Sequence, residues 1–445
     1  MTHFDKISNS IERLKQAQKL FQEKVLNNPK FKWYQRAVWV VSISWAAVVT
    51  IQSIPYYSAI GIGESAYKHG DYTTAEIKFK EALKECEQYS PSDLRRAKIY
   101  NNLAELYRTT YKYGLAEPFY EKSVEIARKL GTSHPELPMS LNNLATLYRD
   151  EGRYVESERM FREALSLWDK RIKRDDANRA AILNGTGKIL RDQGKYAEAE
   201  NYYKQALAIK EKTLGTNDAD NSVVLNNLGG IYRDQGQYSK SEEYYLRALT
   251  IDRAARGENH PYTATDLNNL AGLYREENRI NEADALYKQA LAIRTRELGA
   301  DHPATAKTLL GMAELASKKG DFNQAQRYLE TAVAIQRKTL GEDHPELATT
   351  YNLLGNLYLS QNKIQEACKM QNMCVAIREK KLSPTHPDMG IALIDRGRAE
   401  DLDNDAKDSV SDLNRGKQIL TDALGVEHPV TKRTLAGIRS PLPKT

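Results

Sequence analysis

The polar residues best placed for binding chemistry recur at a fixed interval along the chain. One series consists of asparagines at one position of a repeated phrase: Asn102, Asn143, Asn227 and Asn269. A second series consists of arginines six positions further along the phrase: Arg108, Arg149, Arg191, Arg233 and Arg275. An Asn amide offers a donor and an acceptor to a peptide unit, and an Arg guanidinium binds carboxylates through paired hydrogen bonds. The two series therefore favour binding of an extended, acidic peptide segment.

Both series have a structural alternative, in which their side chains hold neighbouring repeats together. An acidic residue directly follows four of the arginines: Asp150, Asp192, Asp234 and Glu276. Pairing between such an acid and an arginine of a neighbouring unit would leave neither residue for a ligand, and surface ion pairs of this kind are common and weak. Both series end after the sixth repeat, where Gly311 and Leu353 replace asparagine and Ser317 and Leu359 replace arginine. A peptide groove is therefore expected only in repeats two to six.

Most histidines of the chain precede a proline: His134, His260, His302, His344, His386 and His428. Successive copies are a whole helix pair apart, about 10 Å or more, whereas zinc ligands lie about 2 Å from one centre. Glycines such as Gly299 and Gly341 come shortly before these histidines. We interpret each glycine as the left-handed end of one helix and each proline as the first position of the next.

The remaining reactive side chains form no constellation that chemistry requires. The three cysteines, Cys86, Cys368 and Cys374, lack a Cys-x-x-Cys spacing, and we interpret them as small buried hydrophobes. Carboxylates are spread singly along faces that are expected to be solvated. The sequence therefore predicts no catalytic residue, no metal ion and no cofactor, and the protein is not expected to be an enzyme.

The elements that position these side chains repeat every 41 and then every 42 residues. The first of three small positions falls at Gly63, Ala104, Ala145, Gly187, Gly229, Ala271, Ala313, Gly355 and Gly397. Helices approach to about 8 Å only where the side chains at the crossing are small. Larger apolar residues surround these positions at spacings of three, four and seven, which are helical. Each unit is therefore predicted to be a helix, a short turn and a second helix, and neighbouring units must stack to bury their apolar faces.

This alternation of small and large residues resembles the tetratricopeptide repeat. The longer unit, with its Leu-Asn-Asn-Leu-Ala, Leu-Tyr-Arg and Leu-Gly…His-Pro phrases, resembles the kinesin-light-chain type, because the usual tetratricopeptide period is about 34 residues. The resemblance implies an all-α solenoid of about nine helix-turn-helix repeats over residues 58–429, with a terminal helix and tail over 430–445. It also implies that the first helices line a concave face and that the asparagines bond the backbone of a bound peptide.

The chain before the repeats has a different character. Residues 1–33 are basic, and an amphipathic helix is predicted over 5–28, which is a candidate for self-association. Residues 34–55 contain the one long uncharged apolar run and are predicted to span a membrane. The bases before the run place the N-terminus in the cytoplasm and the repeats on the far side. A buried helix that caps the solenoid, in a cytoplasmic protein, and a cleaved signal peptide are the alternatives.

The net charge of +6 does not indicate a nucleic-acid-binding array. Residues 1–36 contain eight Lys or Arg and three acidic residues, so this segment carries +5 and the array only +1. The predicted function is a membrane-anchored adaptor that holds an extended, acidic segment of another protein in its concave groove. A soluble adaptor of the motor-cargo type and an assembly factor for a membrane protein complex are the competing hypotheses.

Overall fold

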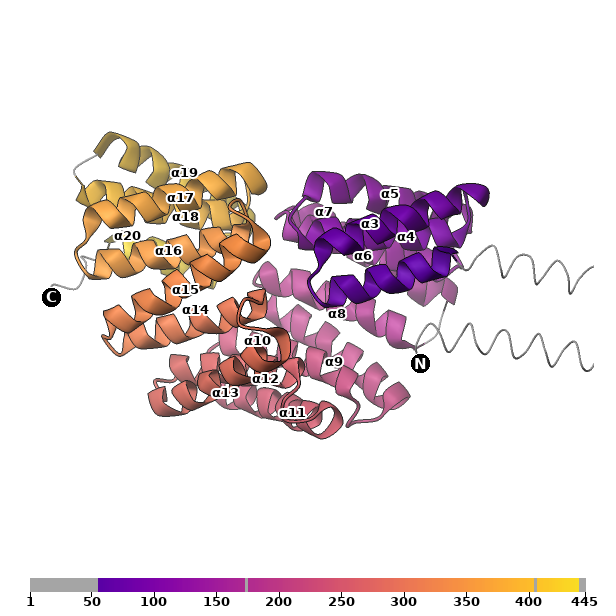
Figure 1. Cartoon of the computed structure of the whole chain (residues 1–445), viewed down its shortest axis with the longest axis horizontal. Helices are drawn as coiled ribbons and strands as arrows, with labels where there is room; N and C mark the ends of the chain where they lie inside the picture. The colour runs from indigo at the N-terminus through magenta and orange to yellow at the C-terminus, as the bar shows by residue number, and fades with distance from the viewer. Residues whose placement is uncertain (1–54, 173–174, 404–405, 440–445) are drawn as a thin grey trace, which may run out of the picture. The chain divides into compact units, whose positions relative to one another are not determined.

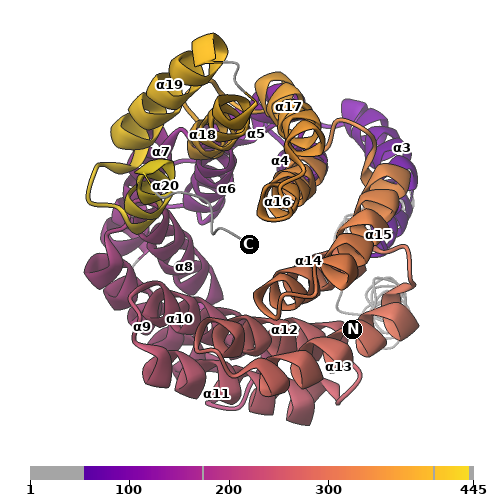
Figure 2. The ribbon, with the colours of Figure 1, turned by 90° about the vertical axis from the view of Figure 1, so that its left-hand side faces the viewer.

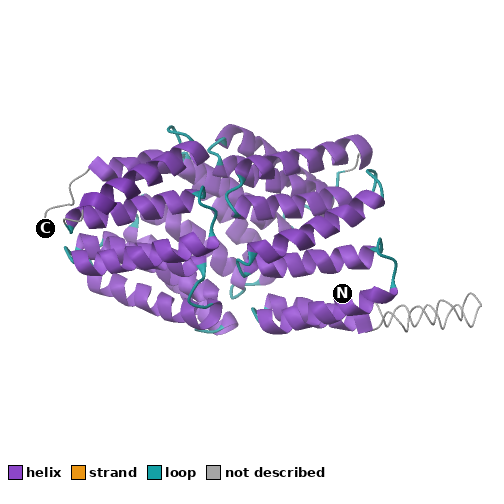
Figure 3. Ribbon diagram, turned by 90° about the horizontal axis from the view of Figure 1, so that it is seen from above, coloured by secondary structure: helices purple, strands orange, loops and turns teal. Residues whose placement is uncertain are grey.

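The computed structural model describes residues 55–172, 175–403 and 406–439, and every regular element within these ranges is helical (Figure 3). The chain divides into two compact units, Met1–Leu106 and Tyr107–Thr445. None of the helices in the described ranges is both long enough and apolar enough to cross a membrane. The predicted N-terminal helix over 1–33 and the predicted span over 34–55 lie outside the described residues, apart from Pro55.

The first unit contains a helical segment over residues 55–68, helix α3 (Tyr72–Glu85), the short η2 (Cys86–Gln88) and most of α4 (Leu94–Thr109). Gly63 is a small position because the ring of Phe79 lies directly against it. A Cβ added at Gly63 would lie only 2.6 Å from Cε1 of Phe79. The helix pair therefore packs as the repeat pattern predicts.

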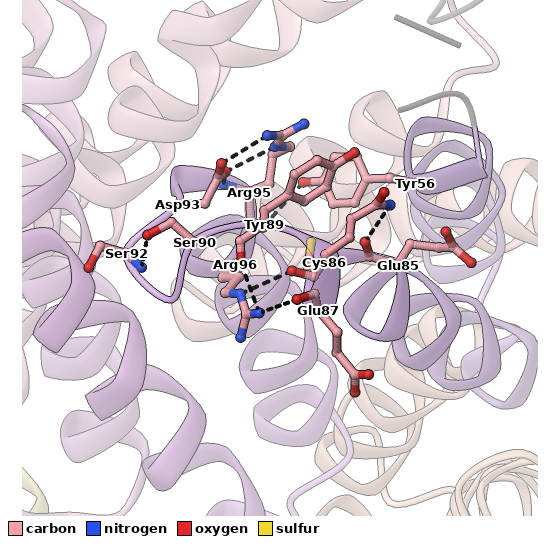
Figure 4. A network of polar contacts seen from close by, with 11 residues as sticks. Tyr56, Glu85, Cys86, Glu87, Tyr89, Ser90, Ser92, Asp93, Arg95 and Arg96 are labelled. Carbon is pink, nitrogen blue, oxygen red and sulfur yellow. Dashed lines mark hydrogen bonds and ion pairs between the residues drawn. The ribbon is translucent and has the colours of Figure 1, made fainter. Parts of the chain in front are cut away.

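Arginines hold the loop that follows α3 (Figure 4). Arg96 donates from Nε to the carbonyl of Cys86 at 3.1 Å and from Nη2 to that of Tyr89 at 3.1 Å. Arg95 pairs with Asp93 at 2.8 Å and lies 3.3 Å from the centre of the Tyr89 ring. Cys86 is buried, and this burial raises the pKa of its thiol to about 11. Cys86 thus packs as a small hydrophobe, as the sequence predicts.

In the second unit, first and second helices alternate along the chain (Figure 1). The unit begins with the end of α4 and with α5 (Tyr113–Lys129). The pairs that follow are α6 (Glu136–Asp150) and α7 (Tyr154–Leu167), α8 (Ala177–Asp192) and α9 (Tyr196–Leu214), α10 (Ser222–Asp234) and α11 (Tyr238–Arg256), α12 (Pro261–Glu276) and α13 (Ile280–Leu298), α14 (Pro303–Lys318) and α15 (Phe322–Leu340), α16 (Pro345–Ser360) and α17 (Ile364–Lys381), and α18 (Pro387–Leu402) and α19 (Ala406–Leu424), with α20 (Pro429–Arg439) last. Within this unit, Figure 2 shows first helices such as α8, α10, α12 and α14 on the inner side and their partners outside.

Each pair is held together at the predicted small positions. A Cβ added at Gly229 would lie 2.6 Å from Cδ1 of Tyr245, and one added at Gly187 would lie 2.6 Å from Cε1 of Tyr203. Ser241 donates its hydroxyl to the carbonyl of Gly229 at 2.8 Å, so the small serine also fixes the crossing. These contacts bring the first and second helices close enough to bury an aromatic ring between them.

The His-Pro pairs begin helices, as the sequence predicts. Pro303 stands at the start of α14, and Nδ1 of His302 accepts a hydrogen bond from the backbone N–H of Ala304 at 3.1 Å. The preceding helix ends at Gly299 with φ of +98°. The same cap is made by His260, His344 and His386. A cap of this kind requires a neutral imidazole, because protonated Nδ1 cannot accept.

Several joints between successive pairs contain buried polar contacts of different kinds. Three consecutive joints carry, at one repeat position, Asp252 with Asp266, Arg294 with Thr308, and Gln336 with Thr350. Arg294 donates from Nη1 to the hydroxyl of Thr308 at 2.6 Å, and Thr350 donates to Oε1 of Gln336 at 2.7 Å. Neighbouring repeats are therefore joined by chemistry that changes from one joint to the next.

The second unit also makes contacts between its early turns and its late helix starts. We call these contacts the seam, which consists of Tyr111 against His344, Gly152 against His386, and Gly194 against His428. The ring centres of Tyr111 and His344 are 4.3 Å apart. The partners in each contact are 233 or 234 positions apart in the sequence, so the seam follows the repeat.

Candidate functional site

The arginine series connects successive first helices. Arg191 donates from Nε to Asp234 at 2.7 Å, and Arg149 donates from Nε to Asp192 at 2.5 Å. Burial lowers the pKa of the Arg191 guanidinium, but the hydrogen bond with Asp234 and the negative charge of that carboxylate together raise it by more, so the net shift is upward. Arg108 pairs with Asp150 and Arg275 with Glu314 in the same direction along the unit. The arginines therefore take part in the contacts between repeats that the sequence offered as an alternative.

Arg233 is held less tightly than the other members of the series. Its guanidinium lies 3.7 Å from Asp234 and 3.7 Å from Glu276, and both distances exceed hydrogen-bonding range. Within the described residues, no hydrogen bond is made by the Arg233 guanidinium. Its side chain is about one quarter exposed. Arg233 therefore has donors available for another molecule.

Gly230 makes room for the guanidinium of Arg191, whereas a side chain at Gly272 would reach only ordinary contact with that of Arg233. A Cβ added at Gly230 would lie 2.8 Å from Nη1 of Arg191, and one added at Gly272 would lie 3.6 Å from Nη1 of Arg233. The same repeat position carries Glu314, which pairs with Arg275. The sequence analysis did not single out this position, although a second small residue beside the packing glycine was visible in the repeat.

The asparagine series also makes contacts between repeats. Asn227 donates to Oδ1 of Asn184 at 2.8 Å, and Asn269 donates to Oδ1 of Asn226 at 3.0 Å. The Oδ1 atoms of Asn227 and Asn269 accept no hydrogen bond from the described part of the chain. In each of these two amides, Nδ2 donates to the neighbouring repeat, and Oδ1 can still accept a hydrogen bond from another molecule.

The other asparagines of the series have separate surroundings. Asn143 accepts from Nδ2 of Asn142 at 3.3 Å in the second unit. Asn102 lies in the first unit and donates to Oε1 of Glu64 at 3.4 Å. A role of either side chain in ligand binding stays a prediction.

The second unit contains a cavity of about 1020 Å³ at the ends of its first helices. Three arginines of the series, Arg191, Arg233 and Arg275, line it together. Arg108, Arg149 and the four asparagines of the series are not among its lining residues. Tyrosines at the starts of second helices form part of the wall, namely Tyr154, Tyr196 and Tyr238. The structure thus gathers one third of the predicted site residues around a single space.

The opposite wall comes from the far end of the chain. Pro387 and Ile391 of α18 and Arg433 of α20 line the cavity, together with His428 before α20. Burial lowers the pKa of the His428 imidazole, which is therefore neutral at pH 7. Sequence reasoning missed these residues because they lie about 110 to 240 positions from the arginines that line the same cavity.

The charge of the cavity is mixed rather than uniformly basic. Its basic residues are Arg191, Arg233, Arg275, Lys318 and Arg433, and its acidic residues are Asp192, Asp234, Glu276 and Asp388. The acidic residues beside the arginines offset much of the positive charge. Such a lining suits a ligand that brings both carboxylates and backbone amides, since both kinds of group find partners.

No group of three or more potential metal ligands occurs in the described ranges of the chain. Cys374 is buried, and burial raises the pKa of its thiol to about 11, so it is not a reactive thiolate. The side chains that line the cavity offer hydrogen bonding and charge pairing.

A family model described as "Tetratricopeptide repeat" matches residues 56–129, 136–212, 220–296, 267–338 and 305–380. These matches cover more than half of the chain and confirm the predicted tetratricopeptide repeats. The comparison with curated proteins finds no match.

Several solved structures have similar folds. The apo quorum sensor NprR from B. thuringiensis is 16% identical and covers 83% of this chain and 99% of its own, with a TM-score of 0.53. A Rap protein complexed with Competence and Sporulation Factor is 18% identical and covers 76% of this chain and 97% of its own, with a TM-score of 0.51. A Podosopora anserina protein of the kinesin light chain type is 24% identical and covers 46% of this chain and 96% of its own, with a TM-score of 0.39.

Proposed function

Because the chain belongs to the tetratricopeptide repeat family, we propose that it is a protein-interaction scaffold. The proposed ligand is an extended, acidic segment of another protein, bound in the cavity that Arg191, Arg233 and Arg275 line. Helical arrays of this family are commonly binding surfaces, and function then depends on the site rather than the fold. A Rap protein of similar fold was solved in complex with Competence and Sporulation Factor, which supports ligand binding by an array of this kind.

The observation that carries the proposal is the state of Arg233. Its ion-pair distances of 3.7 Å leave the guanidinium without a hydrogen bond inside the described chain, beside a cavity of about 1020 Å³. A carboxylate of the ligand can bind there without displacing a hydrogen-bonded partner. Planar guanidinium and carboxylate groups fit through two parallel hydrogen bonds. Arg233 is therefore the proposed anchor of the segment.

Asn227 and Asn269 do not line the cavity, so they would bind the peptide backbone only where the segment extends beyond it. The Oδ1 atoms of Asn227 and Asn269, which accept nothing from the described chain, can accept from backbone N–H groups of an extended segment. Each such bond contributes about 0.5–1.5 kcal/mol net, so several are needed for useful affinity. For Asn102, Asn143, Arg108 and Arg149, contact with the segment stays a prediction from their place in the series.

Replacing Arg233 by Gln tests the proposal. A display library of random dodecapeptides is selected against the purified full-length chain, and binding of the enriched peptides is measured by fluorescence anisotropy. We expect the enriched peptides to be rich in Asp and Glu. Hydrogen bonds to charged groups contribute about 1.5–3 kcal/mol, so R233Q should weaken binding by about 10- to 100-fold.

The matched control is R162Q on the outside of the array. Arg162 also carries an ion pair, with Glu158 at 2.6 Å, but does not line the cavity. This variant should bind the peptides within about twofold of the parent affinity, as expected for a surface change away from the site. The proposal fails if no peptide is enriched, or if the enriched peptides bind R233Q as tightly as the parent chain.

The place where the scaffold works depends on residues 34–55. The sequence predicts a membrane anchor there, with a soluble cargo adaptor and an assembly factor for a membrane complex as the alternatives. The family assignment and the helical array support the adaptor and do not require an anchor. Carbonate extraction of cell membranes separates the two cases, because an anchored chain stays in the pellet and an adaptor is released. Enrichment of the subunits of one complex in a pull-down would favour the assembly factor.

A further inference from the structure

A second, smaller pocket lies where the arginine series ends. Its volume is about 330 Å³, and residues of α14, α15 and α16 line it. Its walls contain Ala313, Ala325, Leu329, Leu353 and Leu357. Lys318 lines both this pocket and the larger cavity, so the two spaces adjoin.

Departures from the repeat pattern create this pocket. Ser317 stands where Arg233 and Arg275 stand in earlier repeats, so no guanidinium extends from α14 to α16. Leu329 stands at the position of the buried rings of Tyr245 and Tyr287. The smaller side chains leave space between the two first helices that earlier repeats fill.

The pocket is apolar at its base and polar at its edge. Leu329 and Leu357 are almost fully buried, whereas Glu314, Ser317 and Lys318 stand at the edge. Lys318 donates from Nζ to the carbonyl of Arg275 at 2.6 Å, which fixes its alkyl chain along the boundary between the two spaces. An apolar side chain that enters the pocket leaves water while its backbone remains beside polar groups.

We propose that this pocket binds one apolar side chain, of Leu, Met or Phe type, from the same acidic segment that contacts Arg233. This inference rests on the proposed function and adds the specificity of the segment. Neighbouring first helices lie about 8–10 Å apart, so the pocket is about 20–25 Å from the Arg233 position. An extended chain covers about 3.3 Å per residue, which places the apolar residue about six to eight residues from the carboxylate.

The closing experiment fills the pocket with the residue type found at this position in the three preceding repeats, Tyr203, Tyr245 and Tyr287. Because Ala313 and Leu353 stand where glycines meet those earlier rings, circular dichroism first checks that L329Y folds. The probe is a display library of dodecapeptides with one Asp fixed near the N-terminus and all other positions random. We expect Leu, Met or Phe to be enriched six to eight residues after the fixed Asp. Removing the burial of such a side chain should weaken binding about 10- to 100-fold in L329Y.

Two comparisons keep the outcome independent of how L329Y folds. L246Y makes the same change at an exposed residue of α11 and should leave binding unchanged. An enriched peptide whose apolar residue is replaced by Ala should lose about 10- to 100-fold in affinity for the parent chain, and far less for L329Y. The inference is overturned, and the proposed function stands, if peptides bind in an Arg233-dependent way without apolar enrichment. If no peptide binds at all, both fail.

Discussion

Replacing Asp266 by Asn will remove a loss of stability that the parent protein shows as the pH rises from about 4 to about 8. Asp252 and Asp266 are both almost completely buried at the joint between α11 and α12. Asp252 accepts from Arg256 at 2.7 Å, and Asp266 accepts from Nδ2 of Asn226 at 2.6 Å. The Arg256 guanidinium bonds Asp252 and Asp220, so Asp266 is the buried carboxyl group that no cation contacts in the described chain, and its neutral form is favoured.

Burial, opposed by the Asn226 hydrogen bond and assisted by the charge of Asp252, raises the pKa of Asp266 to about 8 from the ordinary 3.8. The folded state then binds more protons than the unfolded state between these two values, so stability is full below pH 3.8 and declines as the pH rises through 8. A tenfold difference in proton affinity between the folded and unfolded states is equivalent to about 1.36 kcal/mol, so a pKa raised this far lowers stability at high pH by a measurable amount.

Thermal unfolding at pH 5, 7 and 9 measures this effect. The amide of D266N can accept from Asn226 and donate to Asp252, so it replaces the protonated acid without a change of shape. We expect D266N to exceed the parent in stability at pH 9, with a flatter profile. D301N, at an exposed carboxylate that pairs with Lys338 on the surface, should keep the parent profile. Equal slopes for D266N and the parent chain would contradict a shared proton.

Replacing Gly152 and Gly194 together by Ala will disrupt the seam of the second unit. A new Cβ would lie 2.8 Å from Cδ2 of His386 at the first position and 2.6 Å from Cδ2 of His428 at the second. Neither histidine can move freely, because each accepts a hydrogen bond that caps a helix. Overpacking costs about 1–3 kcal/mol per site, so the seam variant should lose about 2–6 kcal/mol in addition to backbone strain.

Gly236 and Gly320 provide the matched control for the seam. Their φ angles of +71° and +78° are close to those of the seam glycines, +73° and +76°, but no atom of the described chain lies within 4 Å of an added Cβ. The control double variant therefore carries the same backbone strain, about 1 kcal/mol per site, and no collision. Faster hydrogen exchange in α18 and α20 should appear only in the seam variant. Identical exchange in the two double variants would show that the seam does not form in solution.

The sequence was sufficient for the features that depend on local spacing. The small residue at Gly229 and the ring at Tyr245 are 16 positions apart, and their contact follows from a helix, a turn and a helix. The His302 cap follows from the order of glycine, histidine and proline around it. Both features depend only on residues within one repeat or its junction with the next. Because the same residues recur in several repeats, the sequence is sufficient to predict them.

The features that the sequence did not disclose depend on small rotations that add up over many repeats. Whether Arg233 forms a hydrogen bond with Glu276 depends on differences of tenths of an ångström in the spacing of α10 and α12. Residue types alone do not determine that spacing. The position of His428 opposite Arg233 depends on the twist of every intervening pair. The ends of the two polar series, at Ser317 and Leu353, were visible in the sequence, but the pocket that they leave was not.

The changing polar contacts at the joints have a consequence for how the protein folds. Its repeats are alike enough that a helix pair emerging from the ribosome could pack against the wrong neighbour, in its own chain or in another copy. If the α12–α13 pair were skipped, α11 would pack against α14, so Asp252 would meet Thr308 in place of Asp266, and both Asp266 and Arg294 would lose their partners. Only the native order pairs these buried groups with one another, so the joints favour assembly of the repeats in sequence and oppose exchange between molecules.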